Sequence, residues 1–255
     1  MSAADATGPS PRKGELRIIG TSVGREVERL LELLAEITGR RHPRVLQVGS
    51  RASISDRNEL NWRSLVAKRF GSRAAFVGID LVDGPNVDVR LDVGATPQTV
   101  TAALGQDLFD LVLCCHVLEH TPAPQRAARN IVRLLRPGGL AYIATPWSQA
   151  FHAAPDDYWR FSLRGLMLLF DELEIVSAFY SGGDVGLDVA YRVERDGQIE
   201  LQPAAGAIER GLFQLVLDHE DNRAVLARQA TERLPVSRTY LPTLFVNLVG
   251  RKAPK

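Results

Sequence analysis

The chain has 255 residues, of which 45% are apolar, and this is enough to bury one sizeable core. Its 31 basic and 30 acidic residues leave a net charge of +1, so its surface has no strong field to attract nucleic acid or an anionic membrane. The two cysteines, Cys114 and Cys115, are adjacent in an apolar run, where neighbouring side chains point to opposite faces of a strand. Nothing in this arrangement suggests a disulfide scaffold or a zinc cluster, and we expect a reducing, cytoplasmic compartment.

Residues 1–14 are rich in Ala, Ser, Pro and Gly and lack the apolar segment of a signal peptide, so we predict a disordered tail. The following segment, Ser22–Thr38, has apolar residues at helical spacing, and Gly39 ends the pattern. Charged residues, Glu26 among them, fall on the opposite face. This predicts an amphipathic helix that packs on the structure following it.

Short apolar runs then alternate with helical patterns, which is typical of a parallel sheet with crossover helices. The predicted strands are Arg44–Val48, Ala75–Ile79, Val87–Leu91, Phe109–Cys114 and Leu140–Thr145. The predicted helices are Leu60–Phe70, Pro97–Leu104 and Pro124–Leu135. Proline and glycine in the segment Leu135–Gly139 stop the last of these helices and turn the chain into the next strand.

The C-terminal part continues the pattern less regularly. Ser162 is predicted to cap a helix through Phe170, followed by strands at Leu173–Ser181 and Thr243–Val249. Residues 184–240 are predicted to be an insertion between these last two strands, inside one domain that covers residues 15–255. The insertion has the pattern of a hairpin around Asp196-Gly197 and of two helices, at Ala204–Leu217 and Asn222–Leu234.

Ligands of doubly wound sheets bind where the strands end, so the residues at those points are candidates for a site. Gly49 follows the first strand, but the second and third glycines of a dinucleotide-binding turn are missing, which favours a ligand without a pyrophosphate. Asp80 ends the second strand, where a carboxylate can accept both hydroxyls of a ribose; it could instead cap the loop. Asp92 could accept an adenine amino group or serve as a turn residue.

The fourth strand leads into a polar cluster of His116, Glu119 and His120. His116 and His120 are four residues apart, so on a helix they would share a face, and this spacing also suits a metal pair. Because no third ligand is evident, we predict no metal here, with one histidine as a cap and the other lining a cleft.

Together these segments resemble the class I S-adenosylmethionine-dependent methyltransferases, in particular the small-molecule enzymes of ubiquinone and natural-product pathways. The resemblance covers about residues 44–170. It is carried by Val45–Arg51, Val77–Asp80, Phe109–Thr121, Leu134–Gly139 and Asp157–Phe161, and Leu-Glu-His and Arg-Pro-Gly-Gly are its most specific parts.

The resemblance implies a Rossmann-like, doubly wound α/β sheet of seven strands whose last strand is antiparallel. It implies S-adenosyl-L-methionine as cofactor, with the glycine turn at its methionine end, the acid at position 80 on its ribose, and Asp92 and Val93 beside its adenine. The chain departs from the family at Gln47, where the usual residue is acidic, and in the missing second glycine. The candidate cofactor-binding residues are Gln47, Gly49, Ser50, Arg51, Asp80, Leu81, Asp92, Val93 and His116.

The sulfonium methyl group is itself the electrophile, so the protein mainly has to align an acceptor and exclude water. A hydroxyl acceptor also benefits from a general base, and His120 and His152 are the candidate catalytic residues. The segment Trp147–Phe161, here called the lid segment, mixes aromatic and hydrogen-bonding side chains suited to a polar ring or a sugar. Its candidate substrate-binding residues are Trp147, Asp157, Tyr158 and Arg160.

We therefore predict methyl transfer to a small molecule, as O-methylation of a hydroxylated metabolite or natural product, by a chain that forms a homodimer or a monomer. One alternative is a non-catalytic binding protein that keeps the fold, suggested by Gln47. Another is an NAD-type oxidoreductase, against which the missing glycines count. A nucleic-acid methyltransferase is disfavoured because the fourth strand is followed by Cys-His-Val and not by an Asn/Asp-Pro-Pro motif.

Overall fold

The structure is a computed structural model. It describes residues 21–39, 42–51, 61–71, 74–149, 151–152, 156–182, 191–193, 199–200 and 244–254. The predicted tail at residues 1–14 and the two helices predicted at Ala204–Leu217 and Asn222–Leu234 lie outside these residues.

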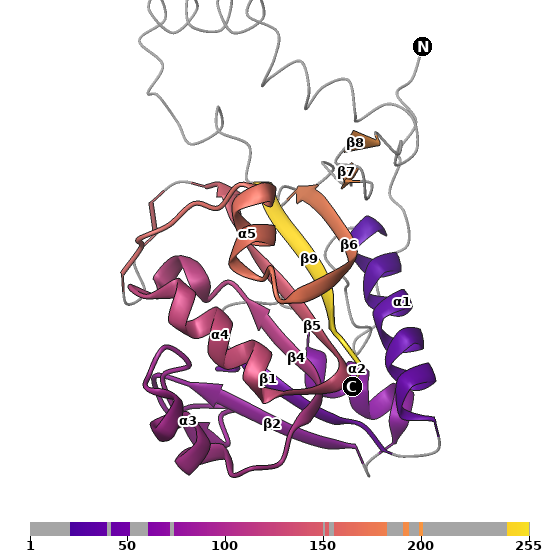
Figure 1. The fold of residues 1–255 in the computed structure, drawn as a ribbon, viewed down its shortest axis with the longest axis vertical. Coiled ribbons are helices and arrows are strands. Elements are labelled where there is room, and N and C mark those ends of the chain that lie inside the picture. The colour runs from indigo at the N-terminus through magenta and orange to yellow at the C-terminus, as the bar shows by residue number, and fades with distance from the viewer. Residues whose placement is uncertain are drawn as a thin grey trace, which may run out of the picture.

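A single twisted sheet forms the centre of the molecule, in the strand order β3-β2-β1-β4-β5-β9-β6-β7-β8 (Figure 1). Its strands are β1 Arg44–Val48, β2 Ala75–Asp80, β3 Val89–Arg90, β4 Phe109–Cys115, β5 Leu135–Ser148, β6 Leu173–Gly182, β7 Tyr191–Val193, β8 Ile199–Glu200 and β9 Leu244–Lys252. Strands β1 to β5 pair in parallel, whereas β9 is antiparallel to both β5 and β6. The predicted seven-stranded arrangement with an antiparallel last strand is confirmed, and the short hairpin β7–β8 extends it next to β6.

Helices cover both faces of the sheet, as Figure 1 shows with α3, α4 and α5 on one side and α1 on the other. They are α1 Thr21–Thr38, α2 Trp62–Phe70, α3 Pro97–Leu104, α4 Pro124–Leu134 and α5 Leu163–Leu169, with a short 3-10 turn, η1, at Leu118–His120. Alternate residues of the central strands enter two separate apolar clusters: Leu46 and Val112 pack with α3–α5, and Val45 and Leu113 with α1 and α2. In the described part of the chain, no helix has both the length and the apolar composition needed to cross a bilayer.

Side-chain caps set several helix boundaries close to the predicted positions. The Asn61, Thr96 and Ser162 side chains accept hydrogen bonds from backbone N–H groups in the first turns of α2, α3 and α5. Each cap satisfies one of the N–H groups that a helix start leaves without an internal partner. The sequence-based starts of α3 and α5 are therefore confirmed, and α2 begins two residues later than predicted.

Three further local predictions were wrong. The third strand, predicted at Val87–Leu91, spans only Val89–Arg90. The fifth strand begins at Leu135, not at Leu140, because Leu135 pairs with Phe109 before a register shift; Gly138, at φ +79°, lies within this irregular part. Glu26, expected on the polar face of the first helix, is buried and accepts a hydrogen bond from Ser177 Oγ at 3.1 Å. Its partner comes from β6, a contact that helical periodicity could not predict.

Candidate functional site

The carboxyl ends of β1, β2, β4 and β5 meet at one edge of the sheet. Val48 is paired with both Ile79 and Cys114, and Cys115 with Ala144, so the residues that follow these positions are neighbours. This is the edge at which doubly wound sheets bind ligands. It brings together the glycine turn, Asp80 and the polar cluster after the fourth strand.

The glycine turn after β1 packs closely against the residues after β4. Gly49 has φ +69°, and a Cβ atom placed on it would lie 2.3 Å from Val117 Cγ2. The N–H groups of Gly49 and Ser50 both donate to Ile79 O. The Ser50 side chain is buried, and its Oγ has no hydrogen-bond partner in the described structure. This hydroxyl lies against β2, since a Cβ atom placed on Gly78 would be 2.6 Å from it.

Asp80 is held in place by the backbone on either side of it. One carboxylate oxygen accepts from Arg51 N at 3.2 Å and the other from Val82 N at 3.1 Å. The two oxygens still have lone pairs for further donors, as ribose recognition requires. Leu81 and Val82 are both exposed, at 43% and 51%, and offer apolar surface beside the carboxylate.

Asp92 lies in the loop after β3. Its Oδ1 accepts from Gly94 N at 2.7 Å, so Asp92 does act as a turn residue. The second oxygen, Oδ2, is available to an amino group. Val93 is buried, and its carbonyl accepts from Asn130 Nδ2 at 2.8 Å, which fixes the loop to α4.

Gln47 lies in β1, in register with Gly78 of β2 and Leu113 of β4. Its side chain is partly buried. An amide can hydrogen-bond an ammonium group but without the charge assistance of a carboxylate.

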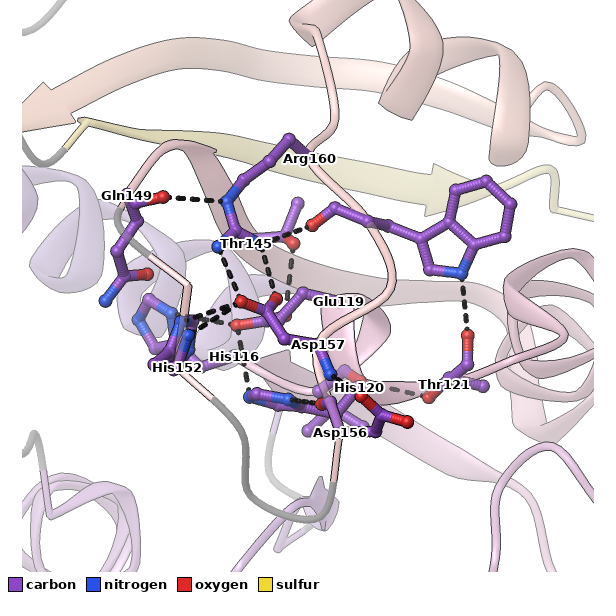
Figure 2. Close-up of polar contacts among 12 residues, drawn as sticks. His116, Glu119, His120, Thr121, Thr145, Gln149, His152, Asp156, Asp157 and Arg160 are labelled. Carbon is purple, nitrogen blue, oxygen red and sulfur yellow. Dashed lines mark hydrogen bonds and ion pairs between the residues drawn. The ribbon is translucent and has the colours of Figure 1, made fainter. Parts of the chain in front are cut away.

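A buried carboxylate lies at the centre of the second half of the site (Figure 2). Glu119 is fully buried, and its Oε2 accepts from Thr145 Oγ1 at 3.1 Å. Its Oε1 has no hydrogen-bond partner in the described structure and lies 3.7 Å from His116 Nδ1 and 3.9 Å from His120 Nε2. His116 is half-exposed, has φ +56°, and its ring meets that of Phe245 edge-on.

The lid segment contributes a second carboxylate, Asp157, which is bound by Arg160 and His152. Figure 2 shows Asp157 between Arg160 and His152. Asp157 Oδ2 accepts from Arg160 Nη2 at 2.7 Å and from His152 N at 2.8 Å, and it lies 3.4 Å from His152 Nδ1. The bonds from Arg160 hold the pKa of the Asp157 carboxyl well below its usual range. Asp157 and Arg160 thus form an ion pair within the lid segment.

The two candidate bases meet directly. The rings of His120 and His152 lie 4.9 Å apart, edge to face. His120 Nδ1 donates to the carbonyl of Asp156, which leaves Nε2 facing Glu119. Two further bonds tie the lid segment to η1: Tyr158 N donates to Glu119 O at 2.7 Å, and Trp159 Nε1 to Thr121 O at 2.9 Å.

The predicted substrate residues have different surroundings. Trp147 and Tyr158 are exposed, at 37% and 48%, and present aromatic surface to solvent. A hydrogen bond to Asp156 raises the pKa of the Tyr158 hydroxyl. Asp157 and Arg160 instead bind each other, so their first role in the structure is to hold the lid segment.

Sequence reasoning did not select Glu119 or Thr145 as site residues. The signal for Glu119 was present, since it lies between two histidines just after a buried strand. Its complete burial could not be predicted, because the backbone that bonds to it, at Tyr158 and Trp159, is distant in sequence.

These features fit S-adenosylmethionine. The turn at Gly49 lies at this ligand-binding edge, where Val117 fills the space of its missing Cβ and the bonds to Ile79 O fix its backbone. Asp80 has lone pairs for the ribose, and Asp92 Oδ2 for the adenine amino group. Thr121 lies between the loop of Asp92 and the lid segment. A Cβ atom placed on Gly94 would be 3.3 Å from its Cγ2, and its carbonyl accepts from Trp159 Nε1.

The chain is similar in fold to several solved methyltransferases. One is the Burkholderia thailandensis 1,6-didemethyltoxoflavin-N1-methyltransferase, with 17% identity, a TM-score of 0.43, and coverage of 90% of this chain and 82% of that chain. Another is a SAM dependent methyltransferase from Archaeoglobus fulgidus, with 16% identity, a TM-score of 0.47, and coverage of 89% and 94%.

Among curated proteins, the chain is similar to ubiquinone biosynthesis O-methyltransferases. It is 30% identical to that of Pseudomonas putida over 115 residues, which are 40% of this chain and 50% of the relative. It is 40% identical to that of Caulobacter vibrioides over 57 residues, which are 22% and 23%. The matches thus span half or less of these relatives. A family described as "Methyltransferase domain" matches residues 20–183, more than half of the chain, and the chain therefore belongs to that family of methyltransferase domains.

Proposed function

We propose that this domain transfers the methyl group of S-adenosylmethionine to a hydroxyl oxygen of a small hydroxylated metabolite. The observation that carries the proposal is the meeting of His120 and His152 over the buried Glu119, at the sheet edge that also holds Asp80. The name of the curated relatives, O-methyltransferase, supports oxygen as the acceptor atom.

The cofactor, when bound, supplies a sulfonium methyl group that is electrophilic without further activation. The chain's own residues then have three tasks. Asp80, Asp92 and the turn at Gly49 hold the nucleoside and the methionine end. Trp147 and Tyr158 provide aromatic surface for the acceptor. The tie between the lid segment and η1 keeps water away from the reacting atoms.

The histidines have the tautomers that a base requires. Because a carbonyl oxygen only accepts, the proton of a neutral His120 lies on Nδ1, and its Nε2 then has the lone pair. His152 Nδ1 faces the Asp157 carboxylate, which favours the same tautomer. One of these nitrogens would take the proton of the acceptor hydroxyl as its oxygen becomes methylated.

Calorimetry with S-adenosylhomocysteine tests the cofactor half of the site. Asp80→Ala is expected to weaken binding by about tenfold or more, because the ribose hydroxyls lose a charged acceptor. His152→Ala is expected to bind the compound as wild type does but to lower turnover on phenolic and sugar acceptors. Unchanged affinity in the Asp80 variant would contradict the site assignment.

Two alternatives give different outcomes in the same experiments. The first alternative, suggested by Gln47, is a non-catalytic binding protein. It would bind a ligand without methylating any of the phenolic and sugar acceptors. An oxidoreductase would bind NAD in preference to S-adenosylhomocysteine.

We further propose that the partner is a small molecule and not a nucleic acid, and that the chain forms a homodimer. We propose a cytoplasmic compartment, since both cysteines are free thiols.

A further inference from the structure

We propose that Glu119, His120 and His152 form a binding site for one divalent transition-metal cation of the zinc type. One donor atom from each side chain lies within 4.8 Å of the others. Two imidazole nitrogens and one carboxylate oxygen are a donor set found in catalytic zinc centres, where a fourth position stays open. Donor atoms around tetrahedral zinc are about 3.3 Å apart, so movements of about 1 Å would close the site.

The first argument is the buried oxygen of Glu119. Its Oε1 is directed toward His120 Nε2 yet has no hydrogen-bond partner in the described structure. An uncompensated oxygen of a fully buried carboxylate is costly. His116 Nδ1 lies 3.7 Å from the same oxygen. When His120 is neutral, its proton lies on Nδ1, bonded to the Asp156 carbonyl, so the lone pairs of Nε2 and Oε1 face each other across 3.9 Å. A cation between them resolves this arrangement.

The second argument is the support around the ligands. A metal-binding histidine usually donates its other ring nitrogen to a carbonyl or a carboxylate, which orients the ring. His120 does so to the carbonyl of Asp156, and His152 Nδ1 faces the Asp157 carboxylate. Glu119 is oriented in turn by Thr145. Each of the three ligands therefore has an outer partner already in place.

The sequence could not indicate this site, because its third ligand is 32 positions beyond His120. The four-residue spacing pointed to His116 and His120 as a pair. In the structure His116 Nδ1 lies 3.7 Å from the same Glu119 oxygen, but its ring packs against Phe245, and it is not among the three clustered residues.

Cation binding does not depend on methyl transfer. The role of the open position, which would hold the acceptor oxygen, does rest on the proposed function. His120 and His152 would then act as ligands, and the cation would favour loss of the hydroxyl proton to water before the oxygen attacks the methyl carbon.

Zinc titration of chelator-treated protein without a histidine tag tests the proposal by calorimetry. We expect one equivalent to bind to wild type, and His152→Ala and Glu119→Gln to bind it at least tenfold more weakly, because each removes a ligand. His42→Ala is the matched control: His42 is an exposed histidine before β1, at the opposite edge of the sheet, and its removal should leave zinc affinity unchanged. Circular dichroism checks that each variant is folded.

Cobalt gives a second measurement that needs no variant. Cobalt bound to these three ligands should show visible absorption bands that zinc competes away. Absence of zinc binding by wild type, or equal affinity in the His152 variant, overturns the proposal and would assign the Glu119 contacts to protonated histidine instead. Binding of S-adenosylhomocysteine, measured on the same samples, shows separately whether the proposed function holds.

Discussion

At the residue scale, the backbone conformation of Gly49 connects the sheet to the candidate cofactor site. Its left-handed conformation turns the chain, and its missing Cβ leaves room for Val117. Gly105 has a similar φ of +75°, but a Cβ atom placed on it would meet no described atom within 4 Å. Substitution of Gly105 by alanine therefore tests backbone strain alone, whereas substitution of Gly49 tests strain together with a steric clash.

We expect Gly105→Ala to lower the free energy of unfolding by about 1–3 kcal/mol, because its φ of 75° and ψ of -168° are essentially accessible to glycine alone. Gly49→Ala should lower it further, because its Cβ would overlap Val117, and should also weaken binding of S-adenosylhomocysteine. Urea denaturation and calorimetry measure the two effects. Equal losses of stability in both variants would show that the contact with Val117 is unimportant.

The two cysteines give a second prediction at this scale. Burial, and then the charge of Glu119, raises the pKa of Cys115 to about 12, and burial raises that of Cys114 as well. Since the thiolate is the reactive form, the folded chain should resist iodoacetamide near neutral pH, whereas the chain in urea should be alkylated at both positions. Mass spectrometry distinguishes the two. Rapid alkylation of the folded protein would contradict the burial of this strand end.

At the element scale, the lid segment depends on Arg160. Its guanidinium binds both oxygens of Asp157 and also donates to the carbonyl of Gln149 at 3.1 Å. These bonds position the segment whose backbone contacts Glu119 O. The η1 turn and the lid segment are therefore one structural unit, although 26 residues, 121–146, lie between them in the sequence.

Replacing Arg160 with Ala should loosen this unit. Charge-assisted hydrogen bonds are lost and Asp157 keeps a buried charge, so the amides of Tyr158 and Trp159 should exchange hydrogen about tenfold faster. Arg164→Ala, an exposed arginine on α5, is the matched control and should leave exchange unchanged. Hydrogen exchange followed by mass spectrometry gives the comparison. Equal protection in both variants would mean that Trp159 and Thr121 alone hold the segment.

At the scale of the whole molecule, the sheet separates two apolar clusters. Leu34 of α1 lies in one and Leu166 of α5 in the other, and both are fully buried. Since the two residues share no cluster, their contributions to stability should be independent.

Leu34→Ala and Leu166→Ala should each lower the free energy of unfolding by about 2–5 kcal/mol. The double variant should lose the sum to within about 0.5 kcal/mol, provided that it remains folded in water. Leu168→Ala, on the same helix as Leu166 but 74% exposed, should change stability little. Denaturation curves measure all four. A strongly non-additive double variant would show that the clusters are coupled through the sheet.

Local sequence was enough to establish the alternation of strands and helices, the helix boundaries at Thr96 and Ser162, and the strand ends that carry Gly49 and Asp80. These are local properties: apolar periodicity, capping side chains and turn residues act over a few positions. The family resemblance added the antiparallel last strand.

The surroundings of Glu119, in contrast, are set by tertiary packing. Its burial, the meeting of His120 with His152 and the binding of Arg160 to Asp157 all depend on a segment that returns to the sheet edge from elsewhere in the chain. The same holds for Glu26, which helical periodicity placed outward and β6 buries. Contacts of this kind depend on packing between distant segments, and periodicity and spacing within one segment carry no information about them.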